Sequence, residues 1–247
     1  MPDTIVQILG SPALIGLVVV VVMFGAFVQA GLGMGFGQAA APLLALIDPQ
    51  LVPGPVLMLG FATACWGAWR ERKQIVWSQV WTGCTGRFLG AAAATVVLAY
   101  LTDRDVFMLI FGLLIGVSVI MSAAGWRLPF NRTNLVVMSG VSGLTGTITS
   151  IGAPPLAIVY ADRNPKHARP TLSAFFAFGC AISLAGLFVS GWSKPSDITV
   201  AIMMVPPMVA GTVAAWLVKD RFDKRYRGLL LLLAGGATIV LVARGLL

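Results

Sequence analysis

A single arginine interrupts a long apolar segment in the first half of the chain. Arg87 lies within the stretch WTGCTGRFLG, residues 81–90. A charged side chain at membrane depth costs free energy and marks a functional site by default. Its planar guanidinium suits a sulfonate or a carboxylate. The alternative is a structural arginine that binds helix-end carbonyls or reaches toward a membrane interface.

Two glycine-interrupted stretches offer a second kind of anion contact. They read GLGMGFG (31–37) and TGTITSIGAPP (145–155). Glycine costs a helix interior about 1 kcal/mol relative to alanine, and irregular backbone persists in lipid only where protein or water satisfies it. We expect each stretch to break a helix and to begin a short half-helix whose N-terminal amides suit an anion. The alternative for the first stretch is a close-packing surface of small residues.

Polar side chains next to these stretches complete the predicted site. Gln38 begins the segment after the first break, while Thr149 and Ser150 occupy the matching region of the second. The Gln38 side chain can hydrogen-bond an oxyanion. The hydroxyls of Thr149 and Ser150 either do the same or bind their own helix backbone. Cys65 and Cys180 stand 115 residues apart and either face the site or pack as small apolar residues. The predicted substrate-binding residues are Gly33, Gly35, Gly37, Gln38, Cys65, Arg87, Thr149, Ser150, Gly152 and Cys180.

The composition places these residues in a membrane. The chain has 247 residues, of which 58% are hydrophobic and only 11% charged, whereas a soluble domain carries about a quarter charged residues. The net charge of +8 comes from lysines and arginines in short loops, which is the pattern of membrane topology and not of nucleic-acid binding. Three cysteines without metal-ligand spacing predict no metal site, no disulfide framework and no cofactor. We therefore expect an all-α polytopic membrane protein.

Hydropathy predicts ten apolar segments. They run over about 12–30, 37–47, 52–69, 76–100, 106–125, 135–148, 152–161, 170–190, 198–218 and 228–246. Pro206-Pro207 should kink the segment that begins near residue 198, because proline removes a backbone hydrogen bond from a helix.

The pattern of segments occurs twice. A shift of 115 residues places Gly31 on Gly146, and it aligns the peptides FATAC (61–65) and FAFGC (176–180). We expect two repeats, 1–125 and 126–247, each a glycine-broken helical hairpin plus three transmembrane helices. Thirteen of the 17 lysines and arginines fall in four loops that we place in the cytoplasm, with both termini periplasmic. Equivalent loops then lie on opposite sides, so the repeats have inverted topology, as in many secondary transporters.

These features resemble the TauE/SafE sulfite-exporter family over essentially the whole chain. The resemblance is carried by the glycine-rich first hairpin, by the two halves, and by the peptides APL (41–43) and APPL (153–156). It implies a secondary carrier in the bacterial inner membrane. It also implies that the substrates are small sulfur-containing anions, such as sulfite or organosulfonates like sulfoacetate, which are often exported.

The sequence also allows functions other than a carrier of sulfur-containing anions. An anion channel and a carrier of non-sulfur carboxylates remain alternatives. The single histidine, His167, lies in a basic loop, and no carboxylate stands at a segment centre. These features argue against an enzyme and against a central Na⁺ or metal site. The expected partners are a small anion and membrane lipid, and proton coupling and a homodimer are left open.

Overall fold

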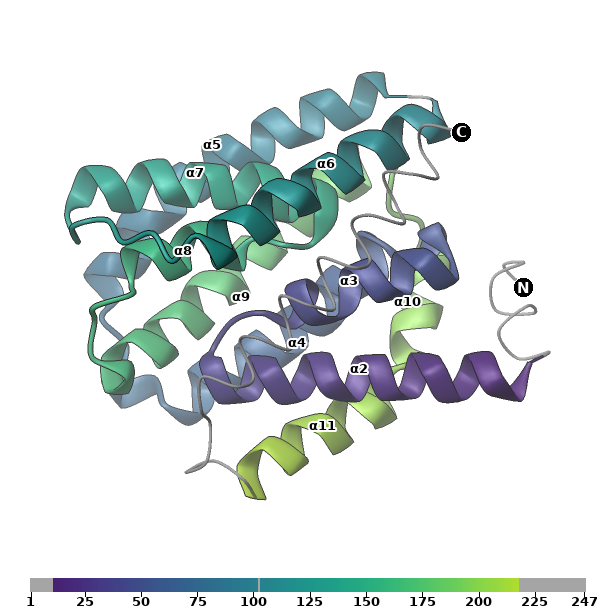
Figure 1. The fold of residues 1–247 in the computed structure, drawn as a ribbon, viewed down its shortest axis with the longest axis horizontal. Coiled ribbons are helices and arrows are strands. Elements are labelled where there is room, and N and C mark those ends of the chain that lie inside the picture. Colours follow the sequence, from purple (N-terminus) through teal and green to yellow (C-terminus); the bar gives the residue numbers. More distant parts are fainter. Residues whose placement is uncertain (1–10, 102, 218–247) are drawn as a thin grey trace.

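The computed structural model describes residues 11–101 and 103–217, which form ten α-helices and two 3-10 turns (Figure 1). The first six elements are α2 (Pro12–Leu32), α3 (Phe36–Ile47), η1 (Pro49–Leu51), α4 (Gly54–Arg70), η2 (Arg72–Gln74) and α5 (Trp77–Tyr100). The next six are α6 (Arg104–Ala123), α7 (Arg132–Thr149), α8 (Ala153–Val159), α9 (Pro165–Val189), α10 (Pro195–Met203) and α11 (Val205–Leu217).

The long helices have the length and composition of membrane spans. Five of them are long and apolar enough to cross a bilayer: α2, α4 with η1, α5, α6 and α9. The pair α10 and α11 is bent by 49° at Met204, directly before the turn of α11 that holds Pro206 and Pro207, and can form a sixth span. The predicted kink is therefore confirmed. The part of the chain that the structure describes is thus all-helical and has the helices of a multi-pass membrane protein, as the composition predicts.

The predicted segments match the observed helices within a few residues, with one larger difference. Helix α9 begins at Pro165, five residues before the predicted start at residue 170. Asn164 caps this helix, because its side chain accepts the amide hydrogen of Lys166 at 3.0 Å, and Pro170 lies in the helix interior. The predicted segment 228–246 lies outside the described residues.

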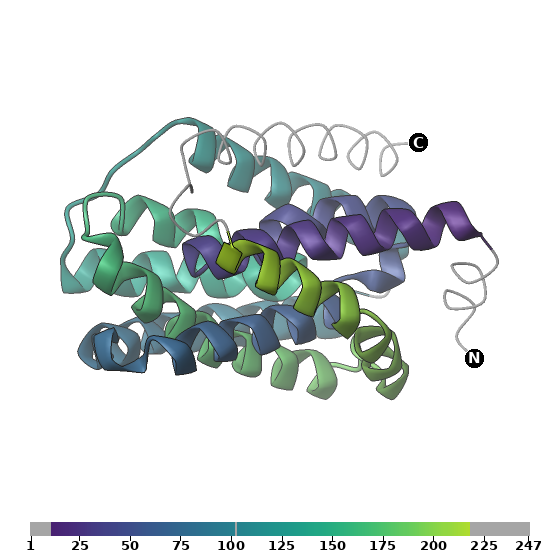
Figure 2. The same cartoon turned by 90° about the horizontal axis from the view of Figure 1, so that it is seen from below.

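Close approach of small residues holds the helices together. In Figure 1 α5 and α7 lie side by side, and a Cβ added at Gly86 or Gly90 of α5 would overlap the backbone carbonyls of Val136 or Gly140 in α7. Helix α11 crosses α2 (Figure 2), where Gly211 lies against the carbonyl of Met23. Van der Waals packing of small residues is the main attraction between helices in lipid.

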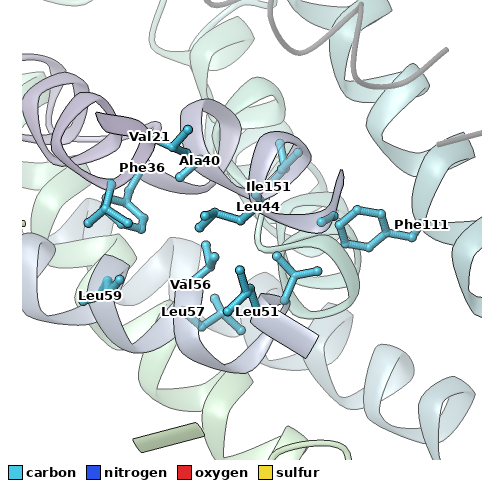
Figure 3. Close-up of a cluster of buried hydrophobic side chains, with 14 of the residues drawn as sticks. Val21, Phe36, Ala40, Leu44, Leu51, Val56, Leu57, Leu59, Phe111 and Ile151 are labelled. Carbon is cyan, nitrogen blue, oxygen red and sulfur yellow. The ribbon is translucent and has the colours of Figure 1, made fainter. Parts of the chain in front are cut away.

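The main apolar core surrounds the short helix α3. Phe36, Ala40 and Leu44 of α3 are buried against side chains of α2 and α4, together with Ile151 from the segment between α7 and α8 (Figure 3). Because α3 is too short to cross a bilayer, its irregular ends must be buried in protein. The core provides that burial, and it brings α3 next to the α7–α8 junction.

Candidate functional site

The first glycine stretch forms a three-residue break between α2 and α3. Gly33 ends α2 with φ 77°, and its amide donates to the carbonyl of Gln29 at 2.8 Å. Gly35 precedes α3 with φ 105°. Both backbone conformations strongly favour glycine. Gly31 and Gly37 lie inside the two helices, so the break is shorter than the glycine stretch itself.

The second break uses hydroxyl groups where the first uses glycine. Helix α7 ends at Thr149, Ser150 adopts φ 64°, and Gly152 precedes α8. The Thr149 hydroxyl accepts the amide hydrogen of Ile151 at 3.1 Å and donates to the carbonyl of Thr145 at 2.7 Å. The Ser150 hydroxyl donates to the carbonyl of Pro53 at 3.1 Å. These bonds stabilise a backbone conformation that is uncommon for a residue with a side chain.

The two breaks are in direct contact. Gly37, in the first turn of α3, lies against the backbone carbonyl of Ser150, and a Cβ at position 37 would overlap that oxygen. Gly35 and Ser150 have positive φ angles and are 150 − 35 = 115 residues apart, the same offset that relates the two halves of the sequence. The half-helices α3 and α8 therefore begin beside each other.

From this shared point α3 and α8 run toward opposite ends of the bundle. Helix α3 ends at Ile47, followed by Asp48 next to the beginning of α4. Helix α8 ends at Val159 and is followed by Tyr160, whose phenol donates to Gln79 in the first turn of α5 at 3.0 Å. Because α4 spans the distance between these two points, the half-helices diverge. Burial raises the pKa of Tyr160, so the phenol keeps the proton that it donates.

Arg87 lies beside the point where the two breaks meet, and it is 1% exposed. Its Nη1 donates to the carbonyl of Ser142 and to the Ser142 hydroxyl, the latter at 2.9 Å. Its Nη2 donates to the carbonyl of Gly179 at 3.4 Å and to the Ser183 hydroxyl at 3.0 Å. Its Nε has no acceptor among the described residues. The guanidinium therefore joins α5 to α7 and α9 and keeps one donor free.

The network continues from Arg87 to the second break. The Ser142 hydroxyl donates to the carbonyl of Gly152 at 2.7 Å, and the Ser183 hydroxyl lies 2.7 Å from that of Thr147. Three glycines leave room for the guanidinium, since a Cβ at each would lie within 2.7 Å of one of its nitrogens. These glycines are Gly146, Gly152 and Gly179.

The charge of Arg87 is not compensated by a carboxylate in the described part of the chain. The two ion pairs found there are Arg127–Asp162 and Arg169–Glu71. The titratable groups that interact with Arg87 are the thiols of Cys84 and Cys180. A buried cation paired only with neutral groups is costly, so the site favours the approach of an anion.

A small cavity of about 30 Å³ lies where Arg87 and the two breaks meet. Seven of the ten predicted binding residues line it: Gly35, Gly37, Gln38, Arg87, Ser150, Gly152 and Cys180. Of the other three, Gly33 packs against Arg169, Cys65 packs in an apolar cluster of α4 and α9, and Thr149 bonds with backbone groups of its own segment. The roles of all ten in binding stay predictions.

A much larger cavity, the vestibule, has a volume of about 880 Å³ and shares Gly35, Gln38 and Ala153 with the small one. Its charged lining residues are Arg127, Arg163, Lys166, Arg169 and Glu71. Gln38 Nε2 donates to the Ser122 hydroxyl at 3.1 Å, and both residues line the vestibule. The vestibule thus leads from the basic loops to the small cavity, with an excess of positive charge along the way.

The sequence did not single out the residues that hold Arg87. Ser142 and Ser183 are serines in apolar helices. The available signal was spacing. Ser139, Ser142 and Gly146 follow one another at intervals of three and four residues, and Gly179 and Ser183 are four residues apart, so each set lies on one helix face.

Comparison with known families now adds to this geometry. Residues 17–242, nearly the whole chain, match the family described as sulfite exporter TauE/SafE. The chain belongs to this family. No curated protein and no solved structure that was compared gives a match.

Membership in the TauE/SafE family agrees with the membrane helices and with the central cation. The family is described as one of sulfite exporters, so its members are membrane transporters. Within the described residues, no group of three or more histidine, cysteine or acidic side chains lies close enough together to hold a metal ion.

Proposed function

We propose that this TauE/SafE protein is a secondary carrier that exports a small sulfur-containing anion, such as sulfite or an organosulfonate, across the bacterial inner membrane. The observation that carries the proposal is Arg87. It is a guanidinium with 1% exposure, no carboxylate partner in the described chain and a free Nε. It lines the cavity where the two helix breaks touch.

The electrostatics of the cavity support anion binding. An unpaired buried charge costs several kcal/mol, and an anion at hydrogen-bond distance offsets that cost. Helix α3 adds donors, because the amides of its first turn have no partners within the helix. One of them, Phe36, donates to the Gln29 side chain at 3.1 Å. The next two belong to Gly37 and Gln38, which line the cavity.

Alternating access supplies the transport step in this proposal. The halves 1–125 and 126–247 act as inverted repeats, and the diverging half-helices α3 and α8 belong to one repeat each. In the present conformation the vestibule connects the cavity to the basic loops, which the positive-inside rule places in the cytoplasm. Export then requires closing this vestibule and opening the opposite end, with both termini periplasmic.

Transport by purified protein in liposomes tests the proposal. Counterflow of radiolabelled sulfite should be saturable, and Arg87→Leu should lower its rate roughly 10- to 100-fold while the protein still inserts. Arg87→Lys retains the charge and shows whether the planar fork is needed. Arg132→Leu, at an exposed arginine in the first turn of α7 that lines neither cavity, is the matched control and should keep most of the rate. Native-rate counterflow by Arg87→Leu would remove Arg87 from the site, and single-channel currents would make the protein a channel.

A further inference from the structure

We infer that the central cavity selects anions by charge and accepts only singly charged ones. The selected forms are hydrogensulfite or a monosulfonate, and the rejected forms are the sulfite dianion and sulfate. The inference rests on the proposed transport function and deepens it. It comes from three features of the cavity: its charge, its free hydrogen-bond donors and its size.

The charge count in the cavity is one. Among the described residues that line it, Arg87 is the only charged one. The nearby titratable groups are thiols, Cys84 on α5 and Cys180 on α9, with Cys65 of α4 next to Cys180. A thiol with its ordinary pKa of about 8.5 is neutral at neutral pH. A monoanion therefore forms a neutral pair with Arg87, whereas a dianion leaves a net negative charge in a medium of low dielectric constant.

In the described part of the chain, only one charged hydrogen-bond donor remains at the cavity to stabilise a second negative charge. Four of the five N–H groups of Arg87 are used by Ser142, Gly179 and Ser183, which leaves Nε–H. The Ser150 hydroxyl donates to Pro53, and the Gln38 side-chain amide donates to Ser122. The donors left at the cavity are thus Nε–H, which is charged, and neutral N–H groups: main-chain amides of the first turn of α3 and side-chain amide hydrogens of Gln29 and Gln38. A doubly charged oxyanion therefore meets one charged donor, and the other donors are neutral.

The cavity is also small. Its volume of about 30 Å³ corresponds to roughly two water molecules. An anion that enters it loses most of its hydration shell, and this loss costs a dianion far more than a monoanion, because the free energy of hydration rises steeply with charge. Close confinement therefore sharpens the discrimination that the single guanidinium begins.

The titration of sulfite itself provides the test. Its second proton is lost near neutral pH, so hydrogensulfite and the dianion can be compared at one total concentration. Initial rates of radiolabelled sulfite uptake are measured in proteoliposomes with equal pH on both sides, after subtraction of protein-free liposomes. From one pH unit below this pKa to one above it, the rate should fall about tenfold, following the hydrogensulfite fraction.

Two other anions separate substrate titration from effects on the protein. Methanesulfonate is a monoanion throughout this range, so its uptake should not change with pH. If its uptake also fell tenfold, the pH dependence would belong to the protein or to proton coupling, and the inference would be wrong. Sulfate should not be transported. A sulfite rate that rises with pH, or sulfate uptake as fast as that of methanesulfonate, would overturn charge selection and leave the carrier in place.

A second positive charge should change the selectivity. Gln38 lines both the cavity and the vestibule, and Gln38→Lys should raise the ratio of sulfate to methanesulfonate uptake about tenfold or more. An unchanged ratio in a folded variant would contradict the inference, and the pH profile of the native protein provides the test if this variant does not fold. If neither sulfite nor methanesulfonate is transported, the proposed function fails and the inference fails with it.

Discussion

Arg87 of α5 and Ser142 of α7 are joined by two hydrogen bonds, and the Ser142 hydroxyl also bonds to Gly152, which lines the cavity. Arg87 Nη1 donates to the Ser142 carbonyl and, at 2.9 Å, to the Ser142 hydroxyl. That hydroxyl donates in turn to the carbonyl of Gly152 at 2.7 Å. One serine therefore connects the buried cation to the break before α8, so a change at the cation can be transmitted to the half-helix.

Ser142→Ala should weaken both the fold and anion transport. It leaves Nη1 with one acceptor fewer and the Gly152 carbonyl without this donor, a loss of about 1–3 kcal/mol. The melting temperature in detergent should then fall by roughly 3–10 °C. Thr85→Ala is the matched control, since the exposed Thr85 hydroxyl donates to Thr82 of its own helix at 2.8 Å. Equal melting temperatures for the two variants would contradict the importance of this link.

Gly37→Ala should disrupt the contact between the two breaks. The added methyl group would overlap the backbone oxygen of Ser150, and a backbone atom cannot move aside as a side chain can. Overpacking of this kind costs at least about 1–3 kcal/mol, so the melting temperature and sulfite counterflow should both fall. Gly16→Ala is the control, because no atom lies within 4 Å of its added Cβ, and it should be neutral or slightly stabilising. Native behaviour of Gly37→Ala would show that the breaks do not need this contact.

The sequence revealed the helix breaks and the central charge because both stand out against an apolar background. Glycines at every second position in a membrane segment predict a turn, and the structure has positive φ at Gly33 and Gly35. An arginine inside such a segment indicates either a functional site or a structural contact with helix-end carbonyls. Both signals arise from the cost of unsatisfied polar groups in lipid, which can be read without knowledge of the neighbouring helices.

The partners of these features could not be read in the same way. Serines such as Ser142 and Ser183 are common in membrane helices, and only the crossing of α5 with α7 and α9 selects those that meet Arg87. Ser150 adopts a conformation that usually favours glycine, so the sequence predicted the second break but did not place its turn at Ser150. The predicted start of α9 was five residues too late, because hydropathy marks only the apolar part of the helix, whereas Asn164 and Pro165 begin it within the basic loop.

Breaking the ion pair between Arg169 and Glu71 should destabilise the protein. Arg169 Nε donates to Glu71 at 2.9 Å and Nη2 makes a second bond, and the two side chains are only 27% and 19% exposed. Glu71→Gln should cost about 1–3 kcal/mol, and the cycle with Arg169→Gln should show a coupling of at least about 0.5 kcal/mol. Asp162→Asn, which breaks an exposed pair with Arg127, should cost about 1 kcal/mol at most. Additive effects of the two changes at the buried pair would show that the bidentate contact contributes little.

Cysteine labelling should establish which side of the membrane the vestibule faces. Lys166 lies in a basic loop and lines the vestibule, whereas the exposed Lys194 lies at the start of α10, beyond the opposite end of α9. A maleimide that does not cross membranes should label Lys194→Cys in intact cells, and it should label Lys166→Cys only after permeabilisation. The native protein serves as the blank, because Cys65, Cys84 and Cys180 are at least partly buried in helices. The reverse pattern would place the basic loops and the open vestibule outside the cytoplasm, so this conformation would be the one that releases the exported anion and not the one that receives it.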